Sequence, residues 1–277
     1  MKKLTENVYV ETQWTSGTQA SGGSNSSFIV TAEGIILIDA PLVPSNAVNW
    51  REMVCQKGKI LYLINTEFHA DHTLGNYFFP VPIIAHEETR RSIPEALGTP
   101  DDVRRKVQEN YSHCTDLVKN YQIGLPTITF LDRLNLYMGQ HHLELLHLPG
   151  HTPGQIAVYV PRERVVFTGD NFSNGFQPAL SYCCPLEWLD SLKRILDLDA
   201  DYIVPGHGEV GEKRTVRDFM SFFQHCVDEV QEAIHRGMSK EQTIESIQFE
   251  DRLPPRHPGR EQQRKNIGRL YDMLSKA

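Results

Sequence analysis

The chain has 277 residues, and its 28 basic and 35 acidic side chains give a net charge of −7. Hydrophobic residues make up 40% of the chain, with 19 glycines and 16 prolines, which excludes a disordered, collagen-like or low-complexity protein. The acidic balance argues against a nucleic-acid partner, because binding a phosphate backbone requires clustered Lys and Arg. A chain of this length can bury a large core, so we expect one domain, with or without an appended lobe.

The sequence carries few signs of export or membrane insertion. The 5 cysteines are odd in number and lack C-x-x-C spacing, which disfavours a disulfide framework. The first residues include two lysines but no apolar run behind them, unlike a signal peptide. No window approaches the ~18 apolar residues of a membrane span. We therefore expect a cytoplasmic protein with no membrane partner.

Strands dominate the first third of the chain. Runs at 27–31 and 35–39 flank a turn, which is a hairpin pattern. The nearly continuous apolar run at 60–65 is typical of a strand buried on both faces, and 81–85 is a further short strand. Between them, residues 45–57 favour a short helix.

The pattern becomes helical over residues 87–125. Thr99 as an N-cap, Pro100 at the first helical position and two acids in the first turn predict a helix start. Apolar residues then recur every three or four positions as far as Val118, which predicts one amphipathic helix. We interpret this segment as a helical insertion.

Strands return after the insertion and helices follow them. The expected strands lie at 127–131, 134–138, 142–148, 156–160, 165–168 and 202–204. Helices are expected at 186–197, around 219–234, and after a capping box at 239–242. Two halves that each run from strands to helices suggest an α/β fold, a four-layered αββα sandwich with two mixed sheets. We expect a domain at 1–235 and a helical C-terminal extension at 236–277 packed on it.

Four short segments concentrate metal-ligand side chains, and each directly follows an expected strand. They are residues 66–72, 149–154, 168–170 and 205–208, and three of the four contain glycine. Imidazole and carboxylate together suit borderline divalent metals such as zinc, manganese or iron. We therefore expect a metal site where these strand ends meet.

These motifs, His-x-Asp-His followed by Gly-His-Thr, Gly-Asp and Pro-Gly-His-Gly, resemble the metallo-β-lactamase-fold hydrolase superfamily. The resemblance covers roughly residues 5–235 and implies a dinuclear metal site at one edge of the sandwich. It implies that His69 and His151 hold the first metal. It also implies a second metal on Asp71, His72 and His207, with a bridging ligand between the two metals. The resemblance implies that Asp170 is this bridging ligand.

One position departs from the family pattern, because Glu67 stands where the family has its first histidine. A Glu carboxylate reaches about as far as an imidazole, so we expect Glu67 to complete the first metal site. The alternative is that Glu67 points elsewhere and the first site is weak or empty. An added carboxylate removes one unit of positive charge and favours harder metals. Zinc is the expected metal, with iron or manganese as alternatives.

The resemblance implies a hydrolase in which a metal-activated water attacks an ester, lactone, thioester or amide bond of a small-molecule substrate. Asp71 is the candidate catalytic residue, because it can bind metal and accept a proton from that water. Two other functions stay open: an iron-dependent, oxygen-using oxidoreductase and a non-catalytic metal-binding protein. The helical insertion and the tail would shape the pocket or a homodimer interface.

Other histidines have structural interpretations. We expect His86 to make a structural hydrogen bond, His147 to be a core residue, and His141 and His142 to lie at the surface beside a turn. Three aromatic residues of the next loop are candidate substrate walls, with ordinary packing equally open: Phe172, Phe176 and Tyr182.

Overall fold

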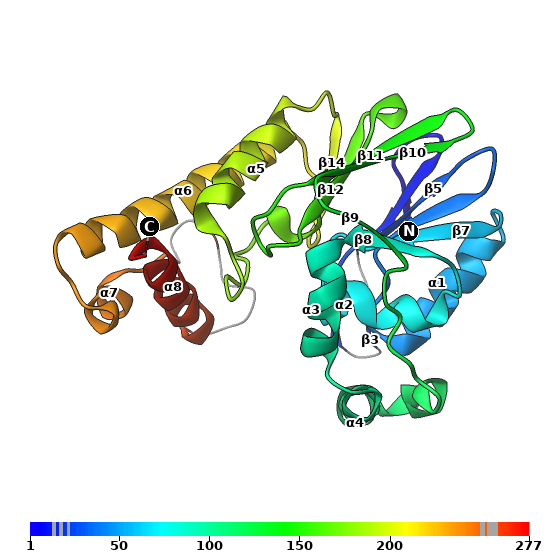
Figure 1. Cartoon of the computed structure of the whole chain (residues 1–277), viewed down its shortest axis with the longest axis horizontal. Helices are drawn as coiled ribbons and strands as arrows, with labels where there is room; N and C mark the ends of the chain where they lie inside the picture. Colours follow the sequence, from blue (N-terminus) through cyan, green and yellow to red (C-terminus); the bar gives the residue numbers. More distant parts are fainter. Residues whose placement is uncertain (13–14, 17–18, 21–22, 250–252, 254–259, 277) are drawn as a thin grey trace.

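Two β-sheets pack face to face with helices on both outer sides (Figure 1). The computed structural model describes residues 1–12, 15–16, 19–20, 23–249, 253 and 260–276. A buried apolar cluster that includes Ile36, Ile64, Val158 and Phe167 fills the space between the sheets. The predicted αββα sandwich is therefore confirmed.

The first sheet is mixed. Its strands, in spatial order, are β1 (Lys2–Lys3), β2 (Val8–Glu11), β5 (Ser26–Val30), β6 (Ile35–Ile38), β7 (Ile60–Ile64), β8 (Ile83–His86) and β9 (Ile128–Phe130). The pairs from β1 to β6 are antiparallel, whereas the pairs from β6 to β9 are parallel. The parallel half brings the carboxyl ends of β6, β7 and β8 to one edge, which is where α/β sheets place their sites. A separate short hairpin joins β3 (Thr15–Ser16) to β4 (Gln19–Ala20).

The second sheet has five strands among the described residues. In spatial order they are β10 (Arg133–Met138), β11 (His141–His147), β12 (Ile156–Val160), β13 (Val165–Phe167) and β14 (Tyr202–Val204). All pairs are antiparallel except β13 with β14. The short 3₁₀ turns Pro161–Glu163 and Gly169–Asn171 lie at either end of β13.

Helices α1 (Pro44–Cys55), α2 (Ala70–Thr73), α3 (Glu87–Leu97) and α4 (Pro100–Asn110) lie on the side of the first sheet (Figure 1). A 3₁₀ turn at Leu74–Phe78 follows α2. The prediction of one helix from Thr99 to Val118 is wrong in its second half. Tyr111 leaves helical geometry (φ −141°, ψ 55°), and Ser112–Val118 continues as a 3₁₀ helix.

Helices α5 (Pro185–Asp197) and α6 (Lys213–His235) cover the second sheet, and α7 (Lys240–Ser246) and α8 (Glu261–Leu274) follow them. Ile267 and Leu270 of α8 join the same buried cluster as Trp188 of α5 and Phe223 of α6. The division at residue 235 stays a prediction, although α8 shares its core with the helices before it.

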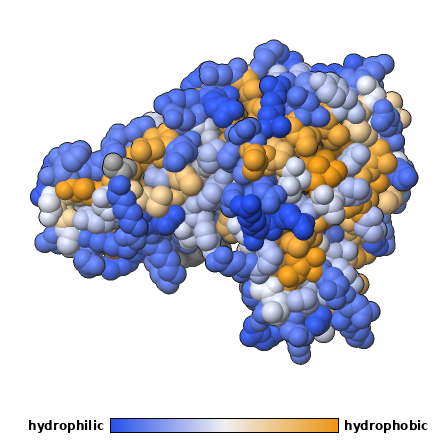
Figure 2. Space-filling view, viewed as in Figure 1, coloured by the Kyte–Doolittle hydropathy of each residue, from blue (hydrophilic) through white to orange (hydrophobic). Residues whose placement is uncertain are grey.

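The surface in Figure 2 is mostly hydrophilic over the part that α6, α7 and α8 form, on the left in Figure 1. Hydrophobic side chains gather over the part that contains the two sheets. Among the described residues, each helix is too short or too polar to span a bilayer. One surface prediction is wrong: His141 is only 6% exposed. β11 begins at His141 itself, and Nε2 of His141 lies 2.9 Å from Oε1 of Glu163.

Candidate metal centre

The seven predicted ligand residues meet where strands of both sheets end. Glu67, His69, Asp71 and His72 follow β7 of the first sheet. The three others come from the second sheet, after β11, β13 and β14: His151, Asp170 and His207. Since turns after strands from two sheets supply the side chains, the site lies at the shared edge of the sandwich.

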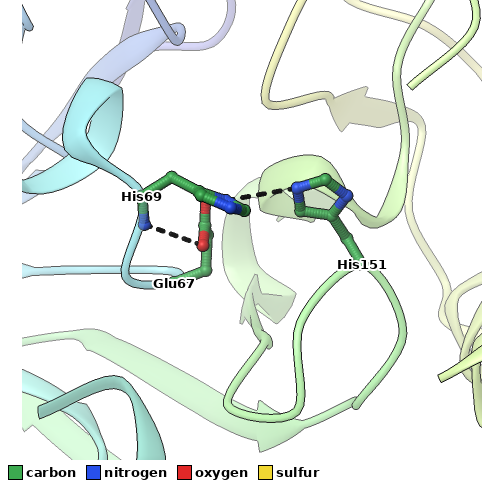
Figure 3. Close-up of side chains that lie close together, drawn as sticks. All are labelled: Glu67, His69 and His151. Carbon is green, nitrogen blue, oxygen red and sulfur yellow. Dashed lines mark hydrogen bonds and ion pairs between the residues drawn. The ribbon is translucent and has the colours of Figure 1, made fainter. Parts of the chain in front are cut away.

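One group joins Glu67, His69 and His151, which offer ligand atoms that all lie within 4.8 Å of one another. Oε1 of Glu67 lies 2.8 Å from Nδ1 of His69, and this nitrogen lies 3.3 Å from Nε2 of His151. Figure 3 shows Glu67 and His69 projecting from one turn toward His151, which comes from an opposing loop. Glu67 is fully buried, and its Oε2 accepts a hydrogen bond from the backbone N–H of His69.

A second group joins Asp71, His72 and His207. Oδ2 of Asp71 lies 3.1 Å from Nε2 of His207. Asp170 faces both groups, because its carboxylate lies 3.2 Å from His72, 3.4 Å from His207 and 3.5 Å from His151. The structure thus brings all seven residues together in the predicted arrangement, and their role as ligands stays a prediction.

Glu67 reaches further into the centre than its expected role requires. Its Oε1 also lies 3.3 Å from Nε2 of His72, so Glu67 forms a third group with His72 and Asp170. The carboxylate therefore faces the other candidate ligands, as ligation requires.

The donor atoms fit divalent metal ions. Nε2 of His72 and Oδ1 of Asp170 are buried and face each other at 3.2 Å, but among the described residues neither makes a hydrogen bond of good geometry. Buried polar atoms that lack a hydrogen bond are costly and rare, and a bound cation would satisfy both of these. A set of imidazole nitrogens and carboxylate oxygens suits zinc, iron or manganese.

Asp39 supports the centre and was not predicted. It follows β6, and its Oδ2 accepts a hydrogen bond from Nδ1 of His72 at 2.9 Å. Its carboxylate also accepts from the backbone N–H and the hydroxyl of Thr66. This arrangement turns Nε2 of His72 toward the centre, as a carboxylate behind a metal-binding histidine does. The available signal was an apolar strand run that ends in a carboxylate.

Glycines let the turns approach each other closely. A Cβ on Gly206 would lie 1.8 Å from Oδ1 of Asp170, and a Cβ on Gly150 would lie 2.4 Å from Oδ1 of Asn171. That Asn171 oxygen accepts a hydrogen bond from the backbone N–H of His151 at 2.9 Å. The Gly-His and Gly-Asp motifs thus reflect backbone packing beside the ligand positions.

Burial and charge act against each other at the centre. Burial disfavours the protonated form of His69, but the adjacent Glu67 carboxylate outweighs it and raises the pKa of His69 to about 9. Burial dominates at His151 and lowers its pKa to about 4. Burial alone would raise the pKa of Glu67, yet the charges of His69 and His72 lower it. Without metal, the Glu67 carboxylate is thus held ionised beside the protonated imidazoles of His69 and His72, and a metal would compete with those protons.

Five of the seven candidate ligands, all except Glu67 and His72, line a cavity of about 180 Å³. Its remaining walls come from the loop after β13 and from α8: Ser173, Phe176, Gln177, Pro178, Ala179 and Gln262. Of the three candidate aromatic walls, Phe176 lines this cavity, whereas Phe172 is buried against Phe219 of α6. Tyr182 is 42% exposed and packs on His69, with ring centroids 5.5 Å apart. A separate cavity of about 330 Å³ beside α6 is lined by none of the seven residues.

Other histidines serve the structure. Nε2 of His86 bonds to the carbonyl of Leu131, and Nδ1 accepts from the N–H of Glu88. His147 stacks on His86 with centroids 3.9 Å apart and is half-buried rather than a core residue, because its Nε2 bonds to the carbonyl of Pro153 near the surface.

Comparison with known proteins gives a family model, described as the metallo-beta-lactamase superfamily, that matches residues 21–207. A linear primary-alkylsulfatase of Pseudomonas sp. (strain ATCC 19151) is 26% identical over 48% of this chain and 27% of its own length. Metallo-beta-lactamase type 2 of Elizabethkingia meningoseptica is 20% identical over 84% of this chain and 85% of its own. The acyl-coenzyme A thioesterase MBLAC2 of Bos taurus is 24% identical over 53% of this chain and 56% of its own.

Solved structures share the fold. A metallo-beta-lactamase from Pontibacter korlensis superposes with a TM-score of 0.60 at 20% identity, covering 80% of this chain and 97% of its own. The sec-alkylsulfatase Pisa1 from Pseudomonas sp. superposes with a TM-score of 0.69 at 14% identity, covering 90% of this chain and 47% of its own.

Proposed function

Because this chain belongs to the metallo-β-lactamase superfamily, we propose that it is a metal-dependent hydrolase of small molecules. The observation that carries the proposal is the convergence beside a cavity of seven ligand-type side chains, among which His72 and Asp170 have buried polar atoms that lack a hydrogen bond within the described part of the chain. Glu67, His69 and His151 would hold one ion. Asp71, His72 and His207 would hold a second ion, and Asp170 would contact both.

When bound, two such metal ions supply an activated water and a Lewis acid for the substrate's carbonyl or equivalent group. Zinc is the metal we propose, and the extra Glu67 carboxylate makes iron or manganese the alternatives.

Asp71 is the proposed proton acceptor. Burial alone would raise the pKa of Asp71, but the hydrogen bond from His207 and the charge of His72 hold it well below its usual range. Asp71 is therefore ionised before a metal binds, and its carboxylate lines the cavity, where it would take a proton from the attacking water.

We propose that the bond that is cleaved is, in order of preference, that of an ester, a lactone, a thioester or an amide. The named relatives act on different bonds, since they include an alkylsulfatase, a thioesterase and β-lactamases. They support hydrolysis as the reaction class and leave the substrate to experiment.

Metal analysis combined with an activity panel tests the proposal. We expect protein purified without added metal to contain zinc, manganese or iron. It should hydrolyse at least one member of a panel of carboxylic esters, lactones, thioesters, alkyl sulfates and β-lactams. Asp71→Ala should lower turnover about 10²–10⁴-fold with an unchanged circular dichroism spectrum, whereas Asp116→Ala at an exposed site should not.

Two outcomes would contradict the proposal. Iron with oxygen consumption in place of hydrolysis would identify an oxidoreductase. An empty site without turnover would identify a non-catalytic protein.

A further inference from the structure

The last helix of the described chain reaches the candidate metal cavity. Gln262 of α8 lines this cavity together with His69, His151 and His207. α8 lies beyond residues 21–207, the part that the family model matches. This wall of the cavity is therefore supplied by the C-terminal extension.

Asn266 fixes α8 to the segment at 178–180, which forms another part of the cavity wall. The Asn266 side chain is 3% exposed, and its Oδ1 accepts from the backbone N–H of Leu180 at 3.0 Å. The same oxygen accepts from Nε2 of Gln262 at 2.9 Å. Nδ2 of Asn266 donates to the carbonyl of Pro178, also at 2.9 Å. One buried amide thus holds both Gln262 and the segment that carries Pro178 and Ala179.

A second buried amide anchors the same wall. Gln177 is 2% exposed, and its Nε2 donates to the carbonyls of Phe249 at 3.3 Å and Leu253 at 2.7 Å. The wall at 177–180 is therefore held to the extension at both of its ends. Burial of Ile267 and Leu270 in the helical core keeps α8 in place beneath these bonds.

We propose that Gln262 binds an uncharged hydrogen-bonding group of the substrate next to the bond that is cleaved, and that Asn266 is its positioning residue. An amide offers two donor hydrogens and an acceptor oxygen, and the bond to Asn266 uses one donor. The neighbouring wall is apolar at Phe176 and Pro178, which suits a short uncharged group in a cavity of about 180 Å³. The inference rests on the proposed hydrolase function.

Two nearly isosteric esters test the contact: the p-nitrophenyl esters of N-acetylglycine, which carries an amide, and of pentanoic acid, which does not. We compare the wild type with Gln262→Met, which keeps the volume and removes the hydrogen bond, and with Lys265→Gln on the exposed side of α8. Gln262→Met should raise KM for the N-acetylglycine ester about 3- to 10-fold, with little change in kcat. KM for the pentanoate, metal content and circular dichroism should stay unchanged, as should every value for Lys265→Gln.

A binding measurement supplies a readout without turnover. The visible spectrum of cobalt-loaded protein is titrated with N-acetylglycine and with pentanoate, the two product carboxylates. Gln262→Met should raise Kd for N-acetylglycine about 3- to 10-fold and leave Kd for pentanoate unchanged. Asn266→Ala should lose the same preference, and adding Gln262→Met to it should cause no further loss, because Asn266 acts through Gln262.

Either readout can overturn the inference. It is overturned if Gln262→Met has the same ratio as the wild type between the KM values of the two esters, or between the Kd values of the two carboxylates. It is also overturned if the wild type binds neither carboxylate. A metal-loaded wild type that hydrolyses nothing in the panel contradicts the proposed function instead, and the Kd ratios then still decide the role of Gln262.

Discussion

Glu67 is the candidate ligand at which this chain departs from the sequence pattern expected for its superfamily. Its carboxylate is fully buried and lies 2.8 Å from His69 and 3.3 Å from His72. A buried carboxylate is stable only with positive charge beside it, and histidine protons or a metal can supply that charge. The residue should therefore decide which metals bind and how many.

We expect Glu67→Gln to lose metal from the first group while the group of Asp71, His72 and His207 keeps its ion, because the amide lacks the charge. Glu67→His restores the family's charge and should bind zinc more tightly. Metal content measured by mass spectrometry checks both variants. Glu52→Gln, at an exposed position of α1, serves as the control. If all four proteins hold the same metals at the same occupancy, Glu67 is not a ligand.

Asp39 orients His72 without facing the cavity. The residue has a left-handed backbone (φ 56°), which Asn tolerates, so Asp39→Asn should leave the turn intact. The amide cannot accept all the hydrogen bonds that Thr66 and His72 donate, so His72 loses its fixed orientation. We expect metal affinity to fall about 10- to 100-fold in chelator competition. An unchanged affinity would show that His72 needs no partner behind it.

The sequence predicts which seven candidate ligands meet, but it does not predict the residues that support them. Turns after apolar strand runs that carry His, Asp or Glu are local signals, so the seven side chains that meet at this edge could be located. Asp39 also ends an apolar strand run, but its role arises only when β6 pairs with β7 and brings Asp39 beside the turn that carries His72. Gln262 is even less predictable, since a tail helix must fold back onto the loop after β13 to bring it there.

At the scale of elements, one buried cluster ties the edge of the first sheet to the second. Glu163, in the 3₁₀ turn before β13, accepts hydrogen bonds from Thr5 and Asn7, which lie between β1 and β2. His141 at the start of β11 completes the cluster. The same cluster explains why a histidine beside a predicted turn is buried.

This cluster should make stability depend on pH. Burial would raise the pKa of Glu163, but hydrogen bonds from Thr5, Asn7 and His141 outweigh it and lower the pKa in the folded state. A lowered folded pKa stabilises the protein above the unfolded value of about 4.3, and this contribution is lost as pH falls through the folded pKa. We expect Glu163→Gln to cost about 1.5–3 kcal/mol of unfolding free energy at neutral pH.

Urea unfolding of metal-free protein in chelator, at pH 7 and at pH 3.5, measures this difference. The gap between wild type and Glu163→Gln should narrow at the lower pH, whereas the exposed Glu95→Gln should show little gap at either. A gap that is equal at both pH values would mean that the ionised carboxylate is not what stabilises the cluster.

At the scale of the whole molecule, the candidate centre joins two sheets that protein contacts already connect. The backbone N–H of Ile156 in β12 donates to the carbonyl of Thr66 after β7, at 2.9 Å. Asn25, before β5, donates its side-chain amide to the carbonyls of Pro205 and Gly208 on either side of His207. These bonds and the apolar layer between the sheets hold the ligand turns in place without a metal.

Metal removal should therefore lower stability without unfolding the protein. Four of the proposed ligands follow β7 of the first sheet and three follow strands of the second, so a bound ion links the two sheets. Because these side chains meet only in the folded chain, the ion binds the folded state and stabilises it. Metal at 100 times its Kd adds about 2.7 kcal/mol, which corresponds to a Tm rise of roughly 5–10 °C for a domain of this size.

Thermal unfolding followed by circular dichroism, with chelator and then with zinc or manganese added back, measures the shift. We expect a cooperative transition in both states and a higher Tm with metal. His207→Ala should show a smaller shift, because it removes one ligand that the second sheet contributes. A Tm that does not respond to metal in the wild type would mean that the seven side chains do not bind an ion in preference to the unfolded chain. The convergence of these residues would then need another explanation.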